Sequence, residues 1–221
     1  MGIGIEVHEF EKHVLGISGL QWPEISICEL GNQKIKFLKH RLPAGRYYRK
    51  LGVKYHISLD LNGKNGAMAV DLDKPVPGKL LNKFDLVTDY GTIEHVNNQY
   101  QVFRNMHDVC KEGGIMLHAL PPSGHWPGHG RYYYSESFFE QLARICNYSP
   151  VTGMQRVARD GREYHDLLLV ALRKHQSPFP GKELFGTLPL EDSGNTATTG
   201  NYTSKKRNSP EFLKKLRSVF Q

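Results

Sequence analysis

The fold is decided by the stretch Phe84-Asp-Leu-Val-Thr-Asp-Tyr-Gly-Thr-Ile-Glu-His-Val96 together with Gly113-Gly-Ile-Met-Leu-His-Ala-Leu-Pro121. The first stretch begins as a short apolar strand and becomes polar after Gly91, and the second is a strand that follows a glycine pair. Apolar residues between them recur at helical spacing, which predicts a strand-helix-strand unit and therefore a parallel sheet. Ligands bind at the carboxyl ends of such strands. The end of the first strand carries four candidate residues: Asp89, Tyr90, Glu94 and His95.

The rest of the chain extends this unit on both sides. Apolar runs predict further strands at residues 25–30, 52–60, 67–70, 151–157 and 165–172, the last two joined by an Asp160-Gly161 turn. Helical patterns cover residues 5–20, 34–40, 102–110 and 135–146, with Ser135 as the N-cap of the last helix. We expect an α/β fold with a Rossmann-like, seven-stranded, mostly parallel sheet, an antiparallel C-terminal hairpin and helices on both faces.

Composition limits the class of protein. The 221 residues carry a net charge of +7, 39% hydrophobic residues and a mean hydropathy of -0.49, and no apolar run approaches the roughly 18 residues of a membrane span. Acidic residues from Glu6 to Glu11 argue against a signal peptide, and three scattered cysteines indicate reduced thiols, so we expect a cytoplasmic protein. Residues 1–175 form the expected domain, and residues 176–221 form a basic tail, partly extended, with a helix at 210–220.

Acidic residues at the strand ends and a C-terminal hairpin are features that this chain shares with a known family. In this order of elements, with Glu94-His95 after the fourth strand, residues 20–174 resemble the class I S-adenosylmethionine-dependent methyltransferases, in particular the small-molecule-like type 11 group. The stretch from His129 to Phe139 resembles that family's approach to the helix after the fifth strand. The resemblance implies S-adenosylmethionine as the cofactor.

The chemistry of that cofactor suits the residues at the strand ends. Ribose hydroxyls need a carboxylate, which Asp60 offers 31 residues after Glu29. Adenine needs an acceptor and an apolar face, and the methionine end needs an acid and backbone N–H groups. The first loop has a single glycine where the family usually has two or three, although asparagine tolerates positive φ. The expected cofactor-binding residues are Glu29, Gly31, Asn32, Asp60, Leu61, Asp71, Leu72, Asp89, Tyr90 and Gly91. Asp85, at the start of its strand, is expected to be structural.

Histidines and aromatic residues mark the expected acceptor side. His95 suits a general base for a hydroxyl acceptor, with packing or positioning as the alternative role. The segment 122–134 is rich in Pro, Gly and aromatic residues and predicts a lid over the acceptor. Its expected acceptor contacts are His125, Trp126, His129 and Tyr132. A metal site is not expected, because the spacing from His125 to His129 contains Pro and Gly and no acid or cysteine lies close by in the sequence.

Three functions are compatible with these patterns. The first is a methyltransferase for a small molecule or a glycan-type hydroxyl, and the second is an inactive methyltransferase-fold module for binding or interaction. Nucleic-acid methylation is the third, suggested by the basic charge and by Lys205-Lys-Arg207. It is disfavoured because Asp89-Tyr-Gly-Thr92 stands where amino-methylating nucleic-acid enzymes carry Asn or Asp, two prolines and an aromatic residue.

Overall fold

A central mixed sheet organises the computed structural model, which describes residues 2–159, 161 and 163–199. Its strands follow the order β4-β1-β5-β6-β10-β8, with β9 paired to β10. The strands are β1 (Ser26–Leu30), β4 (Tyr55–Leu59), β5 (Phe84–Asp89), β6 (Cys110–Leu120), β8 (Tyr148–Pro150), β9 (Gln155–Val157) and β10 (Leu167–Lys174). The pairs among β4, β1, β5 and β6 are parallel and those made by β10 are antiparallel, so the expected fold class is confirmed.

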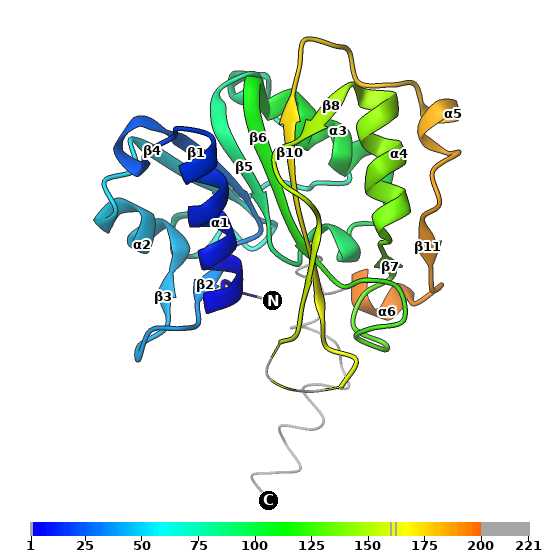
Figure 1. Cartoon of the computed structure of the whole chain (residues 1–221), viewed down its shortest axis with the longest axis horizontal. Helices are drawn as coiled ribbons and strands as arrows, with labels where there is room; N and C mark the ends of the chain where they lie inside the picture. Colours follow the sequence, from blue (N-terminus) through cyan, green and yellow to red (C-terminus); the bar gives the residue numbers. More distant parts are fainter. Residues whose placement is uncertain (1, 160, 162, 200–221) are drawn as a thin grey trace, which may run out of the picture.

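Helices cover both faces of this sheet (Figure 1). On one face α1 (Ile5–Ile17) and α2 (Ala44–Lys50) pack on residues such as Ile27, and on the other α3 (Gln99–Val109) and α4 (Glu136–Cys146) pack on residues such as Cys28. All five residues of β1 are buried, because a parallel strand with helices on both sides has no solvent face. The molecule is thus a three-layer sandwich.

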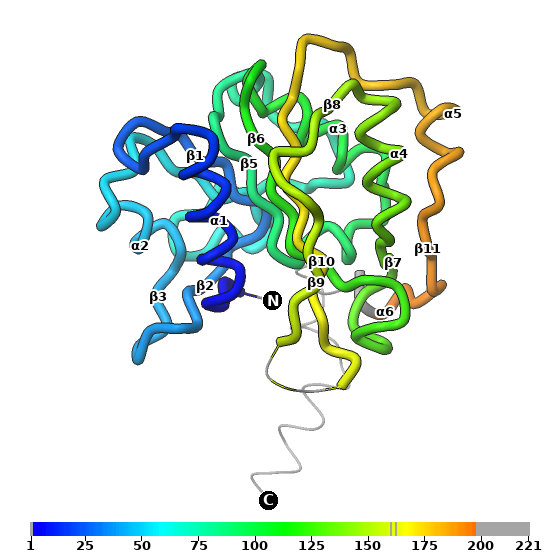
Figure 2. The backbone as a smooth tube through the Cα atoms, viewed as in Figure 1, coloured from blue at the N-terminus to red at the C-terminus, as the bar shows by residue number. Residues whose placement is uncertain are grey.

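Helices α3 and α4 both begin with side-chain caps. Ser135 Oγ accepts a hydrogen bond from the backbone N–H of Phe138 at 3.1 Å, as the sequence predicts. Asn98 does the same for α3, accepting from Gln101 N at 3.1 Å. The β9–β10 pairing confirms the expected hairpin, which Figure 2 traces as two neighbouring segments; residue 160 of its expected turn lies outside the described residues.

Three predicted elements differ from the structure, and one of them is the strand predicted at residues 151–157, which is confined to β9 (Gln155–Val157). The helix predicted at residues 34–40 is wrong: β2 (Lys34–Ile35) pairs with β3 (Leu42–Pro43), and Pro43 precedes α2 instead of closing a helix. Ile35 also bridges Ile3 and is fully buried, so pairing with a distant segment overrides a weak helical pattern. The strand predicted at 67–70 is reduced to a single bridge between Met68 and Leu59.

Short elements complete the connections. Five of them are η1 (Trp22–Glu24), η2 (Lys64–Gly66), η3 (Gly78–Leu80), η4 (Ile93–His95) and β7 (Tyr132–Tyr133). After β10 come α5 (Lys182–Phe185), β11 (Glu191–Asp192) and α6 (Thr196–Thr199). Phe185 and Leu188 are buried in the core beside α3 and α4, so residues 176–192 pack on the same body as the strands. The helix expected at 210–220 lies outside the described residues. None of the helices in the described part of the chain combines the length and the apolar character that a membrane crossing requires.

Candidate cofactor and acceptor site

The order in which strands are added to the sheet reverses between β1 and β5. The chain passes from β1 to β4 on one side and from β5 to β6 on the other, which makes the carboxyl ends of β1 and β5 the switch point at which open α/β sheets bind ligands. Gly31 follows β1 with φ +83°, and Gly91 follows the end of β5 with φ +84°. Both values lie in the left-handed region that glycine adopts without strain.

Gly31 is required by close packing as well as by its φ. A Cβ at this position would overlap Thr92 Oγ1 and lie 2.8 Å from Gln33 Nε2. Thr92 Oγ1 donates to the carbonyl of Leu30 at 2.9 Å, and Gln33 Nε2 donates to Thr92 Oγ1 at 3.1 Å. The ends of β1 and β5 are therefore joined by buried hydrogen bonds across the glycine.

Asp60 lies next to this glycine turn, as the sequence predicts. Its Oδ2 accepts from Asn32 N at 2.9 Å and its Oδ1 accepts from Asn62 N at 2.9 Å. Asn32 Nδ2 donates to the carbonyl of Lys64 at 2.6 Å, which holds the loop after β4 against the loop after β1. The half-buried carboxylate uses one acceptor position on each oxygen and keeps further lone pairs for hydroxyl donors.

Glu29 is a buried carboxylate with an unused oxygen. Its Oε2 accepts from Ser58 Oγ at 2.6 Å and lies 3.5 Å from His56 Nε2, while Oε1 has no hydrogen-bond partner among the described residues. A cavity of about 350 Å³, lined in part by Asn32, His56 and Ser58, lies beside these partners. The unsatisfied oxygen of Glu29 lies near the Gly31 turn and near Asp60, which has unused lone pairs. This combination fits a ligand that carries both a positive charge and hydroxyl groups, such as an aminoacyl nucleoside.

The other expected cofactor residues occupy turns and packing positions. Asp71 accepts from Asp73 N at 3.1 Å and pairs with Lys74 Nζ at 3.1 Å, and Leu72 is fully buried. Leu61 is half-buried beside Asp60. Asp73, in turn, accepts from Asn98 N at 2.7 Å, and this bond fixes the loop that follows the Met68 bridge to the start of α3.

Asp89 and Tyr90 have partners within the protein. Asp89 Oδ1 accepts from the backbone N–H groups of Thr92 and Ile93 at 3.1 and 3.2 Å, and its Oδ2 lies 3.4 Å from His118 Nδ1. It therefore caps η4, the turn that carries His95. The hydroxyl of Tyr90 donates to Glu11 Oε1 on α1 at 2.9 Å, so this side chain ties β5 to the helical layer.

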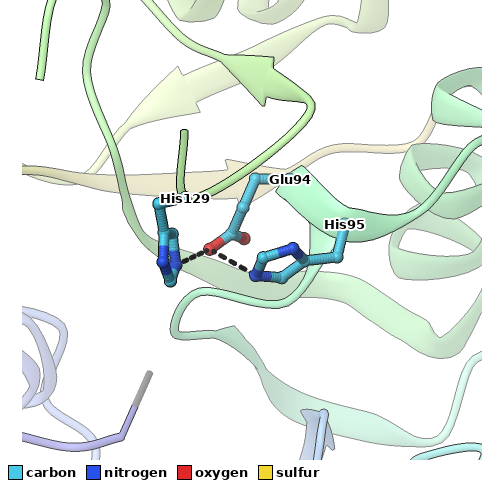
Figure 3. Close-up of side chains that lie close together, drawn as sticks. All are labelled: Glu94, His95 and His129. Atoms are coloured by element: carbon cyan, nitrogen blue, oxygen red, sulfur yellow. Dashed lines mark ion pairs between the residues drawn. The ribbon is translucent and has the colours of Figure 1, made fainter. Parts of the chain in front are cut away.

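Glu94, His95 and His129 form a compact cluster at the expected acceptor side (Figure 3). Glu94 is fully buried, and its Oε1 lies 3.5 Å from His95 Nε2 and 3.4 Å from His129 Nε2. Burial raises the pKa of Glu94, but the two neighbouring histidines outweigh it and leave that pKa lowered. Burial also lowers the pKa of His95, which keeps its imidazole neutral at pH 7.

The contact between Glu94 and His129 corrects one interpretation from the sequence. The absence of an acid near His129 in the sequence counted against a ligand cluster, but the fold brings Glu94 from η4 to that histidine. A signal for this proximity exists in Gly130, where a Cβ would lie 2.9 Å from Glu94 Cγ. Only a residue without a side chain lets the segment 122–134 approach η4 so closely.

That segment is fixed to the body at several points. Trp126 Nε1 donates to the carbonyl of Asp166 at 2.6 Å, and His125 Nδ1 accepts from Asp166 N at 3.2 Å. The hydroxyl of Tyr132 donates to the carbonyl of Asn97 at 2.9 Å. Of the four expected acceptor contacts, the fold brings His129 to His95, and the ring of Trp126 lies 5.3 Å from that of His129 between centroids, tilted by 52°.

Comparisons with known proteins agree with this geometry. Residues 57–118 match the family described as a methyltransferase domain. No curated protein shows significant sequence similarity to the chain. The 1,6-didemethyltoxoflavin-N1-methyltransferase of Burkholderia thailandensis has 16% identity and a TM-score of 0.51, over 77% of this chain and 81% of that one.

Two further solved structures have the same fold. The N-methyltransferase NodS of Bradyrhizobium japonicum has 17% identity and a TM-score of 0.51, over 77% of this chain and 88% of that one. The [4+2]-cyclase SpnF has 14% identity and a TM-score of 0.55, over 77% of this chain and 82% of that one. The Burkholderia and Bradyrhizobium structures contain S-adenosylhomocysteine. The resemblance to class I S-adenosylmethionine-dependent methyltransferases is thus confirmed, and S-adenosylmethionine is the cofactor of this class.

Proposed function

We propose that this protein transfers a methyl group from S-adenosylmethionine to a hydroxyl of a small molecule or glycan. The observation that carries the proposal is the pairing of the Gly31 turn with Asp60 at the switch point of the sheet. A backbone turn without a Cβ and an adjacent carboxylate are what a ribose and an aminoacyl chain need at such a crevice.

Residues of the chain have distinct roles in holding this cofactor. Asp60 would accept from the ribose hydroxyls, and the open oxygen of Glu29 would face the amino group. Gly31 and Asn32 would offer backbone to the methionine end, and Asp71 with Leu72 would receive the adenine ring. When bound, S-adenosylmethionine supplies a methyl group on a sulfonium, a strong leaving group, so alignment supplies much of the rate.

The acceptor side lies between η4 and the segment 122–134. His95, neutral and next to Glu94, is the residue we propose to accept the proton of the acceptor hydroxyl. The fully buried Glu94 would hold the resulting imidazolium, since opposite charges at short range stabilise each other. His125, Trp126, His129 and Tyr132 would surround the acceptor.

Calorimetric titration with S-adenosylhomocysteine tests cofactor binding directly. We expect a 1:1 complex, and we expect Asp60→Asn to weaken it by roughly 10- to 100-fold, the effect of losing charge-assisted hydrogen bonds. Asp85→Asn is the matched control, because Asp85 lies at the opposite end of β5, bonded to Ser26 and Lys111. Absence of heat with the unaltered protein, or equal affinity in Asp60→Asn, would contradict the assignment.

A second candidate function is that of a binding module on the same fold. We retain this second candidate because the chain also resembles a structure named as a cyclase, so the fold by itself does not imply methyl transfer. Transfer of labelled methyl groups to a panel of small hydroxyl compounds and oligosaccharides separates the two. A protein that binds S-adenosylhomocysteine but transfers no label to any of them, or to RNA and DNA, would be a binding module.

A further inference from the structure

We infer that Glu94, His95 and His129 form a binding site for one divalent transition-metal ion, with zinc as the best match. The three residues offer one carboxylate oxygen and two imidazole nitrogens, and these ligand atoms all lie within 4.8 Å of one another. One carboxylate with two histidines is a common ligand set for catalytic zinc. The site adjoins the acceptor side described above (Figure 3).

The separations between the ligand atoms match a shared cation better than a hydrogen bond. Glu94 Oε1 lies 3.4 Å from His129 Nε2 and 3.5 Å from His95 Nε2, beyond the roughly 2.7–3.2 Å of N–H···O bonds. Two ligands of a tetrahedral zinc ion, each about 2.0–2.1 Å from the metal, stand about 3.3 Å apart. The histidine rings meet edge to face, at 5.0 Å and 69°, so both can direct a nitrogen to one point.

The cluster also contains buried polar atoms without partners. Both carboxylate oxygens of the fully buried Glu94, and Nε2 of His129, accept or donate no hydrogen bond to any described residue. An ionised carboxylate without donors is costly to bury, and buried charges are normally paired or coordinate metals. A divalent ion bound by Glu94 Oε1 and His129 Nε2 would satisfy two of these three atoms and neutralise the carboxylate charge.

The ligands are held on well-fixed backbone. The carbonyl of Glu94 accepts from Arg131 N at 3.0 Å, and the hydroxyl of Tyr132 reaches the carbonyl of Asn97 at 2.9 Å. These bonds attach η4 and the residues just after it to the segment that carries His129. Because the ligands come from two elements bound to each other, metal binding would need little rearrangement.

Three protein ligands leave a fourth position open, as in catalytic zinc sites. An acceptor hydroxyl in that position would lose its proton to solvent more readily and remain as a metal-held alkoxide, ready to form the oxygen–methyl bond as the sulfur–methyl bond breaks. In the metal-bound protein His95 is a ligand, and the ion replaces it as the group that lowers the barrier to deprotonation. This role in the reaction rests on the proposed function, whereas metal binding itself does not.

Metal binding is tested on the full chain after removal of metals with a chelator. Calorimetric titration with Zn²⁺ should give one site, and Co²⁺ should give the visible absorption of a tetrahedral complex. Glu94→Gln and His129→Asn should each weaken Zn²⁺ binding by at least about 100-fold, since each removes a direct ligand. His125→Asn is the matched control in the same segment, with its ring nitrogen bonded to Asp166 N, and should bind as the unaltered protein does.

Folding of the variants is checked by thermal melting in chelator. If the buried Glu94→Gln variant does not fold, His129→Asn decides, because His129 is partly exposed and its replacement leaves the core intact. The inference is overturned if the unaltered protein takes up no stoichiometric Zn²⁺, or if His129→Asn binds it equally well. S-adenosylhomocysteine binding measured in chelator reports on the proposed function separately, so failure of one assignment does not mimic failure of the other.

Discussion

Replacing Gly31 by alanine tests how tightly the ends of β1 and β5 are joined. The φ of +83° costs an L-residue about 1–2 kcal/mol. The new Cβ would also displace the Thr92 hydroxyl, which takes part in two buried hydrogen bonds. Breaking these adds about 2–4 kcal/mol, because each is worth about 1 kcal/mol and its buried partner is left unsatisfied. The expected loss in the free energy of unfolding is therefore about 3–6 kcal/mol.

Urea denaturation measures this loss against a matched control. Gly19 has φ +68°, and a Cβ at this position would meet no atom within 4 Å, so Gly19→Ala should cost only the conformational part, about 1–2 kcal/mol. In a Thr92→Ala background the additional cost of Gly31→Ala should fall to a similar value, giving a coupling of about 2 kcal/mol or more. Equal costs for Gly31→Ala and Gly19→Ala, or strict additivity with Thr92→Ala, would refute the packing argument.

Three further outcomes follow from the packing and the charges. Phe185→Ala should cost about 3–5 kcal/mol and the neighbouring, exposed Leu184→Ala less than about 0.5 kcal/mol, as measured by urea denaturation. Burial, with the charge of Lys174, lowers the pKa of His107 to about 4. As the pH falls, the unfolded chain therefore binds this proton before the folded chain does. The free energy of unfolding should fall by up to about 3 kcal/mol between pH 6.5 and pH 4. A His107→Asn variant whose free energy of unfolding falls just as steeply with pH would contradict this. Burial raises the pKa of Asp85, but hydrogen bonds from Lys111 and Ser26 outweigh it and lower that pKa. Asp85→Asn should destabilise the protein by about 1–2 kcal/mol at pH 7, and the difference should vanish as pH falls through the lowered pKa; a difference that persists at about pH 2 would argue against it.

Local patterns in the sequence predicted the elements whose structure depends on neighbours along the chain. The apolar run from Phe84 and the Ser135 cap are such cases, because strand burial and N-capping are decided within a few residues. The proximity of the Gly31 turn and Asp60 could also be predicted from the sequence, because parallel strands bring their carboxyl ends to one edge of the sheet.

Contacts between distant segments were beyond such patterns. The hairpin of β2 and β3 depends on Ile3, which lies far earlier in the chain. Glu94 and His129 meet only because Gly130 allows two loops to touch, and the hydroxyl of Tyr90 meets Glu11 across 79 positions. Sequence periodicity carries no information on contacts between distant segments. The Glu94–His129 contact could therefore be found only in the folded chain.

The link between β11 and β7 couples two distant stretches of the chain. Asp192 binds the guanidinium of Arg131 at 2.7–3.1 Å, and Ser193 N donates to the carbonyl of Arg131 at 2.8 Å. These bonds hold the late segment, residues 191–193, against the loop 122–134, so residues from two distant stretches of the chain anchor this loop. Any movement of this loop would therefore have to break contacts with residues near position 192, about 60 positions further along the chain.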